Sequence, residues 1–272
     1  MKPIKEQVIL VTGATDGLGK GVAIELARRG AAILVHGRDP KRIERTVAEI
    51  GKVARDVSVR PYMADFASLA QVRGMAGQIL SNEPRLDALV NNAGVGVIVP
   101  GNGSRAESED GYEYRFAVNY LAPYLLTRLL LPKLRSSAPS RIVNVSSAGQ
   151  QAIDFNNVML ERGYSGIRAY CQSKLAQILF TIDLAEELRG TGVTVNALHP
   201  ATYMPTKIVP QPISTLEEGV NATVRLVTDA SLDRASGRYF NGLAEARADD
   251  QAYRTEARKK LRELSDRLAG LA

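Results

Sequence analysis

Cysteine and histidine are scarce in this sequence. The chain has one cysteine, Cys171, and two histidines, His36 and His199, among 272 residues. A single cysteine excludes an internal disulfide framework and a cysteine-based zinc site, and two isolated histidines argue against a histidine-rich metal site. The sequence therefore predicts no metal centre.

Long hydrophobic stretches are also missing. No run of about 18 uncharged apolar residues occurs, which argues against a transmembrane segment. The first residues, MKPIKEQVILVTG, lead directly into a strand-like run, so we expect neither a signal peptide nor a membrane anchor. These features predict a cytoplasmic protein.

The composition is that of a soluble globular chain, with 45% apolar and 24% charged residues. The net charge of +6 favours anionic ligands in general. Because the basic residues are mostly interleaved with acidic ones, they do not indicate nucleic acid binding. The densest basic patch, EARKKLREL from Glu256, is expected to be a solvated helix surface.

Short apolar runs alternate with longer helical patterns along the chain. The runs are VILVTG, AAILVHGR, VSVRPYMAD, LDALVNNAG, SRIVNVSS, VTVNALHP and GRYFNG. Strands that are apolar almost throughout suit a parallel sheet covered by helices on both faces. The sequence predicts a single α/β Rossmann domain over residues 1–272, with a doubly wound parallel sheet of about seven strands and a short substrate lid at 201–215.

The first predicted strand ends in TGATDGLGK, and a helical pattern follows at once. Glycines here permit a tight turn and close backbone approach, and the free N–H groups at the helix start can hold a pyrophosphate. The spacing differs from G-x-G-x-x-G, but the flanking strand and helix favour a dinucleotide site over an ordinary glycine-rich connection. The cofactor-binding residues predicted in this loop are Gly13, Thr15, Asp16, Gly17, Leu18 and Gly19.

The second predicted strand ends in VHGRDP, where an acid that binds the ribose hydroxyls of NAD is usual. Gly37 occupies that place and Arg38 follows, so a guanidinium can face the 2′-phosphate of NADP. Asp39 is either a displaced acid or the cap of the next helix ahead of Pro40. The stretch favours NADP(H) over NAD(H).

Tyr170 and Lys174 are four residues apart in the helical pattern YCQSKLAQILF, so their polar ends can reach one small volume. An ammonium within about 4–6 Å of a phenol lowers the phenol pKa, which would let Tyr170 act as a general acid or base. An isolated pair of this kind is more often a core tyrosine beside a lysine that extends to water. The decision therefore depends on the other motifs.

Five ordered motifs resemble the short-chain dehydrogenase/reductase family: TGATDGLG, NNAG at 91–94, VNYLAP around Asn119, NVSS ending at Ser147, and YCQSK from Tyr170. The resemblance implies hydride transfer between a nicotinamide and a carbonyl or alcohol carbon. Tyr170 would be the general acid or base, Lys174 would lower its pKa and bind the nicotinamide ribose, and Ser147 would hold the substrate oxygen. Ser147 is preferred to Ser146 because the family places the active hydroxyl there, and strand alternation separates the two serines.

The resemblance implies further contacts to the cofactor. Asp65 would contact the adenine ring, with capping of the following helix as the alternative, and Asn91 would stabilise the sheet. Either Thr202 or Thr206 would contact the nicotinamide, while His199 has no catalytic role. Beyond the glycine loop, the predicted cofactor-binding residues are Arg38, Asp65, Asn92, Ala93, Gly94, Tyr170, Lys174, Pro200 and Thr202.

Asn119 would complete the catalytic set, although an asparagine in an apolar helix can also be a buried residue satisfied by its neighbours. Pro123 has no N–H to donate to the carbonyl of residue 119, so that carbonyl stays free and can hold a water. In the family, such a water, shared with the lysine, links the active site to solvent. The hypothesis fails if residues 119–123 form a regular helix and hold no water.

Tyr170 follows Ser147 by 23 residues, more than the dozen or so common in the family. The extra loop, 148–169, would form one wall of the pocket. Together with YCQSKLAQILF and TGVTVNALHP it resembles the retinol-dehydrogenase-like branch, which implies a bulky apolar alcohol, aldehyde or ketone. The lid sequence YMPTKIVPQPIS is short and proline-rich, and Ser214 and Glu217 have the spacing of a capping box.

Two other functions are open alternatives. A dinucleotide-binding sensor without turnover would usually lack part of the catalytic set, which is complete here, and an epimerase or dehydratase of sugars would usually carry a longer C-terminal region. The expected partner is a small-molecule substrate, with no nucleic acid and no membrane. The apolar face of LAQILFTIDLAEEL suits helix pairing in a homodimer or homotetramer, with ordinary core burial as the alternative.

Overall fold

The computed structural model describes residues 1–97, 104–202, 204–205 and 213–271. An eight-stranded sheet has the order β3-β2-β1-β4-β5-β6-β7-β8. The strands are β1 (Val8–Val11), β2 (Ala32–Gly37), β3 (Val59–Met63), β4 (Ala88–Asn91), β5 (Ser140–Val145), β6 (Val193–His199), β7 (Tyr239–Asn241) and β8 (Ala244–Ala246). Neighbours from β3 to β7 are parallel, whereas β8 pairs antiparallel with β7. The predicted doubly wound sheet is confirmed, and β8 adds a short antiparallel edge.

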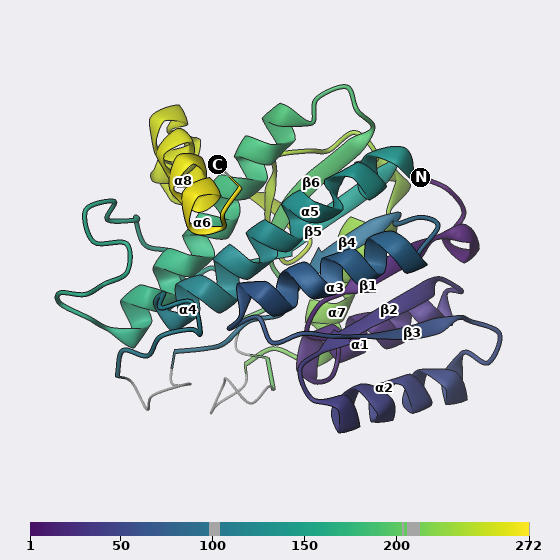
Figure 1. Cartoon of the computed structure of the whole chain (residues 1–272). Helices are drawn as coiled ribbons and strands as arrows, with labels where there is room; N and C mark the ends of the chain where they lie inside the picture. Colours follow the sequence, from purple (N-terminus) through teal and green to yellow (C-terminus); the bar gives the residue numbers. More distant parts are fainter. Residues whose placement is uncertain (98–103, 203, 206–212, 272) are drawn as a thin grey trace.

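Helices cover both faces of the sheet (Figure 1). One face carries α1 (Gly17–Arg28), α2 (Pro40–Val53) and α7 (Leu216–Thr228), and the other carries α3 (Leu69–Asn82), α5 (Ala122–Ser136) and α6 (Gly166–Glu187). The short helix α4 (Tyr114–Phe116) and the π-helix η2 (Ala117–Leu121) lead into α5. The remaining helices are α8 (Thr255–Leu268) and the 3-10 turns η1 (Ile4–Glu6), η3 (Ala230–Leu232) and η4 (Asp250–Tyr253).

Two hydrophobic cores lie on opposite faces of the sheet because strand side chains alternate. In β1, Ile9 and Val11 pack on the α1 and α7 side, while Val8 and Leu10 pack on the α3, α5 and α6 side. All four are buried. This double burial explains why the strands read as continuous apolar runs rather than as alternating ones.

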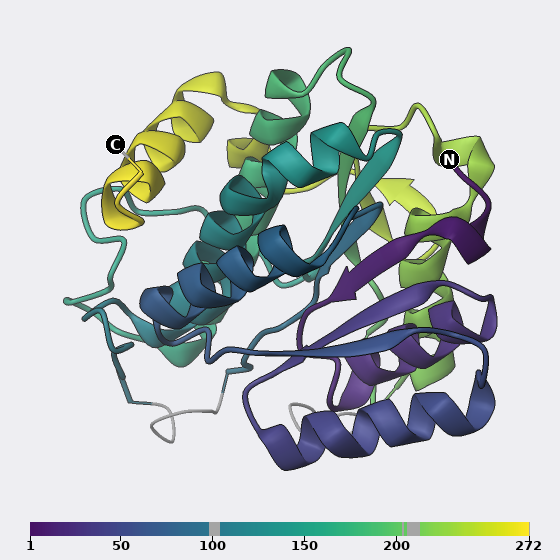
Figure 2. The ribbon, with the colours of Figure 1, turned by 45° about the vertical axis from the view of Figure 1, so that its right-hand side comes forward.

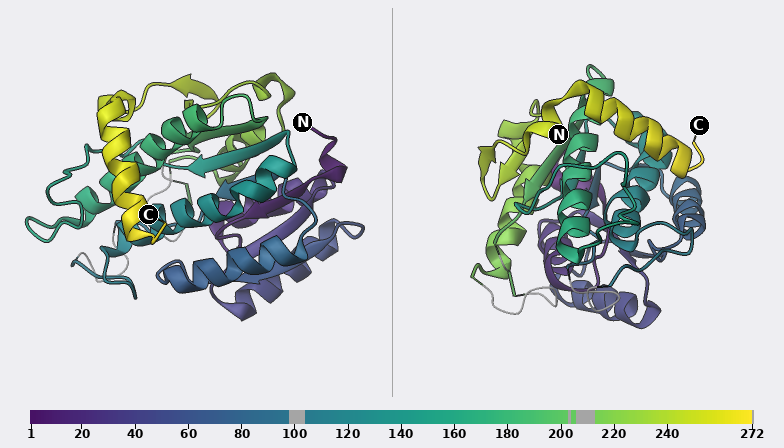
Figure 3. Two further views of the ribbon diagram at one scale, coloured as in Figure 1. Left: turned by 45° about the horizontal axis from the view of Figure 1, so that its top comes forward. Right: turned by 90° about the vertical axis from the view of Figure 1, so that its left-hand side faces the viewer.

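The C-terminal helix α8 packs across α6 and the start of α5 (Figure 2), and a view from the side shows the same arrangement (Figure 3). Its Ser265 hydrogen-bonds Tyr120 at 2.7 Å, and its Asp266 accepts a hydrogen bond from Tyr124, whose ring lies 4.8 Å from that of Phe180. The surface of α6 that was a candidate for subunit pairing is therefore covered within the chain. This part of α6 is therefore buried in the core of the chain, which was the alternative to subunit pairing. A homodimer or homotetramer remains a prediction and would have to form through another surface.

The same docking corrects the expectation that EARKKLREL is a solvated surface. Lys259 and Lys260 are exposed, but Arg258 is buried and pairs with Glu186 at 2.8 Å, and Leu261 is buried. Because α8 is amphipathic, one side of this stretch is basic and exposed, and the other side packs against α6. No helix in the described ranges has the length and apolar character needed to cross a membrane.

Candidate active site

The glycine loop joins β1 to α1 at the edge of the sheet where the parallel strands end. Gly13 and Gly17 have left-handed backbone angles, with φ of 63° and 49°. A Cβ on Gly13 would lie 2.8 Å from the Cα of Ala93, and one on Gly19 would lie 2.3 Å from the carbonyl oxygen of Gly13. Side chains at these positions would clash with the protein itself, so the glycines allow the loop to pack tightly and to turn into the start of α1. The N-terminus of a helix is a favourable place for an anion.

The NNAG stretch packs directly against this loop. Thr12 Oγ1 accepts hydrogen bonds from the N–H groups of Asn92 and Ala93 at 2.9 and 3.0 Å. Asn92 Nδ2 donates to the Thr12 carbonyl at 2.9 Å, and Asn91 Nδ2 donates to Asn144 Oδ1 at 2.8 Å across the buried sheet. Asn91 therefore contributes hydrogen bonds to the sheet, as expected, while Thr12 is a positioning residue that the sequence motif contained but did not identify.

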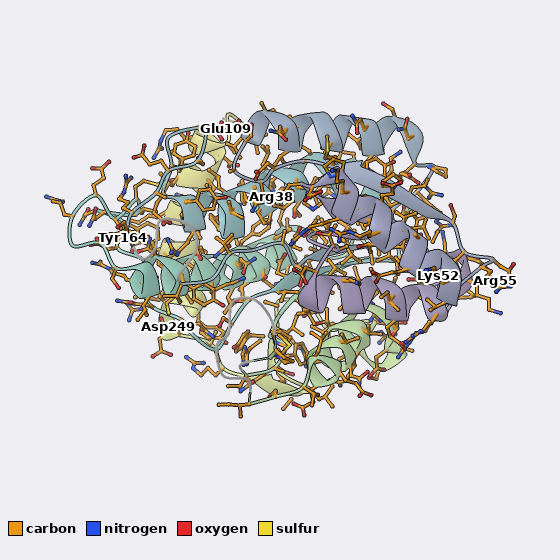
Figure 4. The ribbon with its side chains drawn as sticks, turned by 90° about the horizontal axis from the view of Figure 1, so that it is seen from below. Arg38, Lys52, Arg55, Glu109, Tyr164 and Asp249 are labelled. Atoms are coloured by element: carbon orange, nitrogen blue, oxygen red, sulfur yellow. The ribbon has the colours of Figure 1, made fainter. Side chains whose placement is uncertain are left out.

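At the predicted adenosine end, Arg38 lies beyond β2 with a side chain 62% exposed. Its Nη1 lies 3.5 Å from Asp65 Oδ2 and 3.3 Å from the hydroxyl of Tyr114, to which it donates. Figure 4, a view from below, shows Arg38 near the middle of the molecule, with Tyr164 on one side. Lys52 and Arg55 lie on the other side, at the C-terminal end of α2 and just beyond it. Arg38 and Asp65, both predicted to bind the cofactor, are thus brought together.

The two alternatives at this end are now distinguishable. Asp39 caps α2, because its Oδ1 accepts from the N–H of Arg42 at 3.2 Å and Pro40 occupies the first turn. Asp65 does not cap α3, whose N-cap is Ser68; its Oδ1 instead accepts from the N–H of Ala67 at 2.9 Å.

A second guanidinium at the adenosine end was not predicted from the sequence. Arg42 Nη1 lies 3.6 Å from Oδ2 of Asp16 in the glycine loop. The sequence feature that could have identified Arg42 is its position four residues after Arg38, in the first turn of α2.

His36, which had no predicted role, contacts both the glycine loop and the segment that follows β3. Its Nδ1 accepts from the Gly13 N–H at 3.1 Å and its Nε2 donates to the Ala64 carbonyl at 3.1 Å. Because the Gly13 amide can only donate, the ring proton is on Nε2. Burial lowers the pKa of His36 to about 4, so the imidazole is neutral at pH 7. The neutral ring links the glycine loop to the segment that carries Asp65.

Tyr170 and Ser147 meet at the end of β5. Both Ser147 Oγ and the Tyr170 ring lie beside Gly149, whose N–H donates to Ser147 Oγ at 3.1 Å. Burial raises the pKa of Tyr170, and a hydrogen bond with Ser147 acts in the opposite direction. Ser146 is buried and donates to the carbonyl of Lys174 at 2.7 Å, so its hydroxyl is used within the fold.

Lys174 is buried one turn further along α6. Its Nζ donates to the Val145 carbonyl at 2.9 Å and to Gln177 Oε1 at 3.1 Å, and lies 5.8 Å from the centre of the Tyr170 ring. Burial lowers the pKa of Lys174 to about 8. The expectation that Lys174 lowers the pKa of Tyr170 does not describe the net direction, because loss of solvent around the buried phenol raises that pKa.

Asn119 lies in the π-helix η2, where the N–H of Ala122 donates to the carbonyl of Ala117, five residues back. The helix before Pro123 is therefore irregular, as the hypothesis of a free Asn119 carbonyl allows, and the free carbonyl and its water remain predictions. The Asn119 side chain accepts from the Val95 N–H at 2.7 Å and donates to Ser173 Oγ at 3.0 Å. A Cβ on Gly94 would lie 3.1 Å from Asn119 Oδ1 and 3.6 Å from Lys174 Nζ, which explains the last glycine of NNAG.

Comparisons with known proteins agree with this geometry. The sequence profile of the short chain dehydrogenase family matches residues 7–214. The chain belongs to this family.

Among the relatives of this dehydrogenase is human retinol dehydrogenase 13, with 39% identity over 98% of this chain and 86% of the relative. Mouse retinol dehydrogenase 14 is 36% identical over 97% of this chain and 86% of the relative. A putative short chain dehydrogenase from Shigella flexneri complexed with NADP has a TM-score of 0.71 and 25% identity, covering 88% of this chain and 98% of that one. A putative Escherichia coli enzyme complexed with NADPH has a TM-score of 0.71 and 26% identity, covering 88% and 97%. The dehydrogenase is thus an oxidoreductase of CH–OH groups that uses a nicotinamide cofactor.

The long loop at 148–169, predicted to form one wall of the site, is contacted by Arg115, which had no predicted role. Its fully buried guanidinium donates to the carbonyls of Gly96, at 3.0 Å, and Val97, and to the hydroxyl of Tyr164 at 2.6 Å. Tyr164 belongs to the long loop at 148–169. Arg115 and Asn119 are one helical turn apart, and together they hydrogen-bond residues 95–97 in the loop after β4. Through Tyr164, Arg115 also links this loop to the loop before α6.

The structure describes part of the segment 201–215 that was predicted to be a substrate lid. Pro200 and Thr202 follow β6, with Thr202 Oγ1 3.1 Å from His199 Nε2, whereas Thr206 lies outside the described residues. A cavity of about 360 Å³ opens here between α7 and the end of β7, lined by residues that include Thr202, Ser214, Glu218, Asn221, Asn241 and Leu243. The predicted capping box is one residue out of register, because Thr215 caps α7 and accepts from the N–H of Glu218 at 3.1 Å.

Proposed function

We propose that this dehydrogenase uses NADP(H) to interconvert a bulky apolar alcohol with its aldehyde or ketone. The observation that carries the reaction is the meeting of Tyr170 and Ser147 at the end of β5, with Lys174 buried one helical turn away. A phenol hydrogen-bonded to a second hydroxyl can hold a substrate oxygen and exchange a proton with it.

The residues fit the cofactor. The glycine loop, Asn92 and the start of α1 would hold the pyrophosphate and ribose, because the left-handed glycines Gly13 and Gly17 turn the chain directly into a helix N-terminus, which favours an anion. Arg38 would bind the 2′-phosphate, and Lys174 would bind the nicotinamide ribose. When bound, the nicotinamide supplies or accepts the hydride.

In the reduction direction, Ser147 and Tyr170 donate hydrogen bonds to the carbonyl oxygen of the substrate and polarise it. Tyr170 then transfers its proton to that oxygen. Burial raises the pKa of Tyr170, so the phenol keeps the proton that this step needs at neutral pH. In the oxidation direction the phenolate is required, and the Ser147 hydrogen bond together with a protonated Lys174 favours it.

The first test of the reaction is Tyr170→Phe. NADPH oxidation with an aldehyde panel should fall by about 100-fold or more in kcat, the typical contribution of a general acid, while the Kd for NADPH changes little. Ser147→Ala should have the same pattern. Full turnover by Tyr170→Phe would contradict the proton role, and tight NADPH binding without turnover across a broad panel would instead support the sensor alternative.

Support for NADP(H) comes from Arg38 and Arg42 at the adenosine end and from the structural neighbours that bind NADP or NADPH. A charged hydrogen bond to phosphate contributes about 1.5–3 kcal/mol, so Arg38→Ala should raise the KM for NADPH by about 10- to 100-fold. The KM for NADH should hardly change, because NADH has no 2′-phosphate. An equal effect on both cofactors would refute the assignment of Arg38.

Support for a bulky apolar substrate comes from the similarity to retinol dehydrogenases 13 and 14 and from the long loop at 148–169. A homologous series of straight-chain aldehydes, extended by retinal, measures this directly. Each buried CH₂ contributes about 0.8 kcal/mol, so kcat/KM should rise about fourfold per carbon until the pocket is filled. A flat or falling series would exclude an apolar pocket.

A further inference from the structure

The main chain of Ser147 is held by residues far away in the sequence. The last hydrogen bond between β5 and β6 at this end is donated by the N–H of Ser146 to the Leu198 carbonyl at 2.7 Å. Ser147 lies just beyond it, and its carbonyl accepts from the Tyr239 hydroxyl at 3.0 Å and from Gln150 Nε2 at 3.1 Å. Tyr239 is on β7 and only 4% exposed, so its side chain is held in place by the core.

The chain beyond β7 strengthens this arrangement. Gln150 Oε1 accepts from the N–H of Asp249 at 2.8 Å. The side chain of Gln251 accepts from the Ile153 N–H at 2.7 Å and donates to the Ile153 carbonyl at 3.0 Å. Residues 150–153, which follow the serine, are therefore tied to residues 249–251.

We propose that Tyr239 is a positioning residue that orients the Ser147 hydroxyl toward Tyr170 by holding the Ser147 carbonyl. A residue just past a strand end can rotate about φ and ψ, and a hydrogen bond to its carbonyl restricts that rotation. Tyr239 lies outside the stretch 7–214 that the family profile matches, so the role belongs to the C-terminal part of this chain. The inference rests on the proposed reaction, in which Ser147 holds the substrate oxygen.

The test is Tyr239→Phe, which keeps the ring in the core and removes only the hydroxyl. With the hydroxyl lost, kcat should fall about tenfold while the KM for NADPH stays within about twofold, because the glycine loop is untouched. Since the Ser147 hydrogen bond lowers the pKa of Tyr170, a loosened serine should also move the midpoint of the pH profile for alcohol oxidation to higher pH.

Two comparisons separate positioning from general destabilisation. Tyr112→Phe removes a similar bond, from a tyrosine hydroxyl to the Leu268 carbonyl at 3.1 Å, and should leave the pH profile unchanged. In a Ser147→Ala background, Tyr239→Phe should have no further effect on kcat, because its effect acts through the serine. Equal effects of the two Phe variants, or an additive effect in the Ser147→Ala background, would overturn the proposal.

A measurement that needs no turnover distinguishes this inference from the reaction itself. Hydrogen exchange of the amides of Ser146 and Gly149 should be faster in Tyr239→Phe than in wild type, and unchanged in Tyr112→Phe. If exchange is unchanged in both, Tyr239 does not hold the segment. If exchange accelerates but no substrate is ever turned over, the positioning role stands and the proposed reaction fails.

Discussion

Protonation of His36 should destabilise this protein in mild acid. The free imidazole has a pKa of about 6.5, and burial lowers it to about 4 in the folded chain, although the nearby Asp65 carboxylate opposes that shift. Between these two values the unfolded chain binds a proton that the folded chain does not, so stability falls as the pH falls. Above about pH 6.5 neither state is protonated and the contribution vanishes.

The magnitude follows from the two pKa values. A difference of about 2.5 pKa units corresponds to about 3.4 kcal/mol at full effect, of which about 2 kcal/mol is lost by about pH 5. The structural cause is that an imidazolium has no acceptor for the Gly13 N–H, so the glycine loop would lose its contact with Nδ1.

The assay is urea unfolding followed by circular dichroism, at several values between about pH 5 and about pH 7, for wild type and His36→Asn. Carboxylates and His199 titrate in both proteins, so the difference between the two curves isolates His36. Wild type should lose about 2 kcal/mol more than the variant over this range, and its affinity for NADPH should weaken in parallel. Parallel unfolding curves would refute the buried neutral imidazole.

Three further variants test other contacts. Arg115→Lys keeps the charge but loses the multiple donors that hold the carbonyls of Gly96 and Val97. The KM for the aldehyde should therefore rise several-fold while the Kd for NADPH is unchanged. An unchanged KM would exclude a role of Arg115 in shaping the substrate pocket. Pro123→Ala restores an N–H that can bond the Asn119 carbonyl, so kcat should fall about threefold or more, and an unaffected kcat would argue against a functional water there. Asp266→Ala leaves the Tyr124 hydroxyl without its acceptor and should lower the free energy of unfolding by about 1–3 kcal/mol, measured by urea unfolding; a smaller change would show that α8 docks without this bond.

Local patterns were sufficient for much of the fold. The central predicted strands β1, β4 and β5 are apolar runs buried along their whole length, so the alternation of strands and helices could be read without tertiary information. The glycine loop could be located because its residues, its strand and its helix are consecutive. The catalytic residues could be proposed because the motifs around Ser147 and Tyr170 are themselves local.

Where prediction failed, the deciding contact joined distant segments. A tyrosine near a lysine suggested a lowered phenol pKa, but the depth of burial, which depends on the whole fold, raises the pKa of Tyr170. The basic stretch in α8 suggested a solvated surface, yet Arg258 is buried against α6. Neither the dielectric around a group nor the partner of a helix face is encoded in the spacing of nearby residues.

The sequence alone determined the order of the elements, the place of the glycine loop and the candidates for proton transfer, because each depends on residues close together in the chain. The tertiary structure alone decided how those residues are held. Tyr239 reaches a carbonyl 92 residues away, and the two nitrogens of His36 join loops 23 residues before and 28 residues after it. Such contacts exist only after the sheet has assembled, since parallel strands bring their carboxyl ends to one edge whatever their separation in sequence.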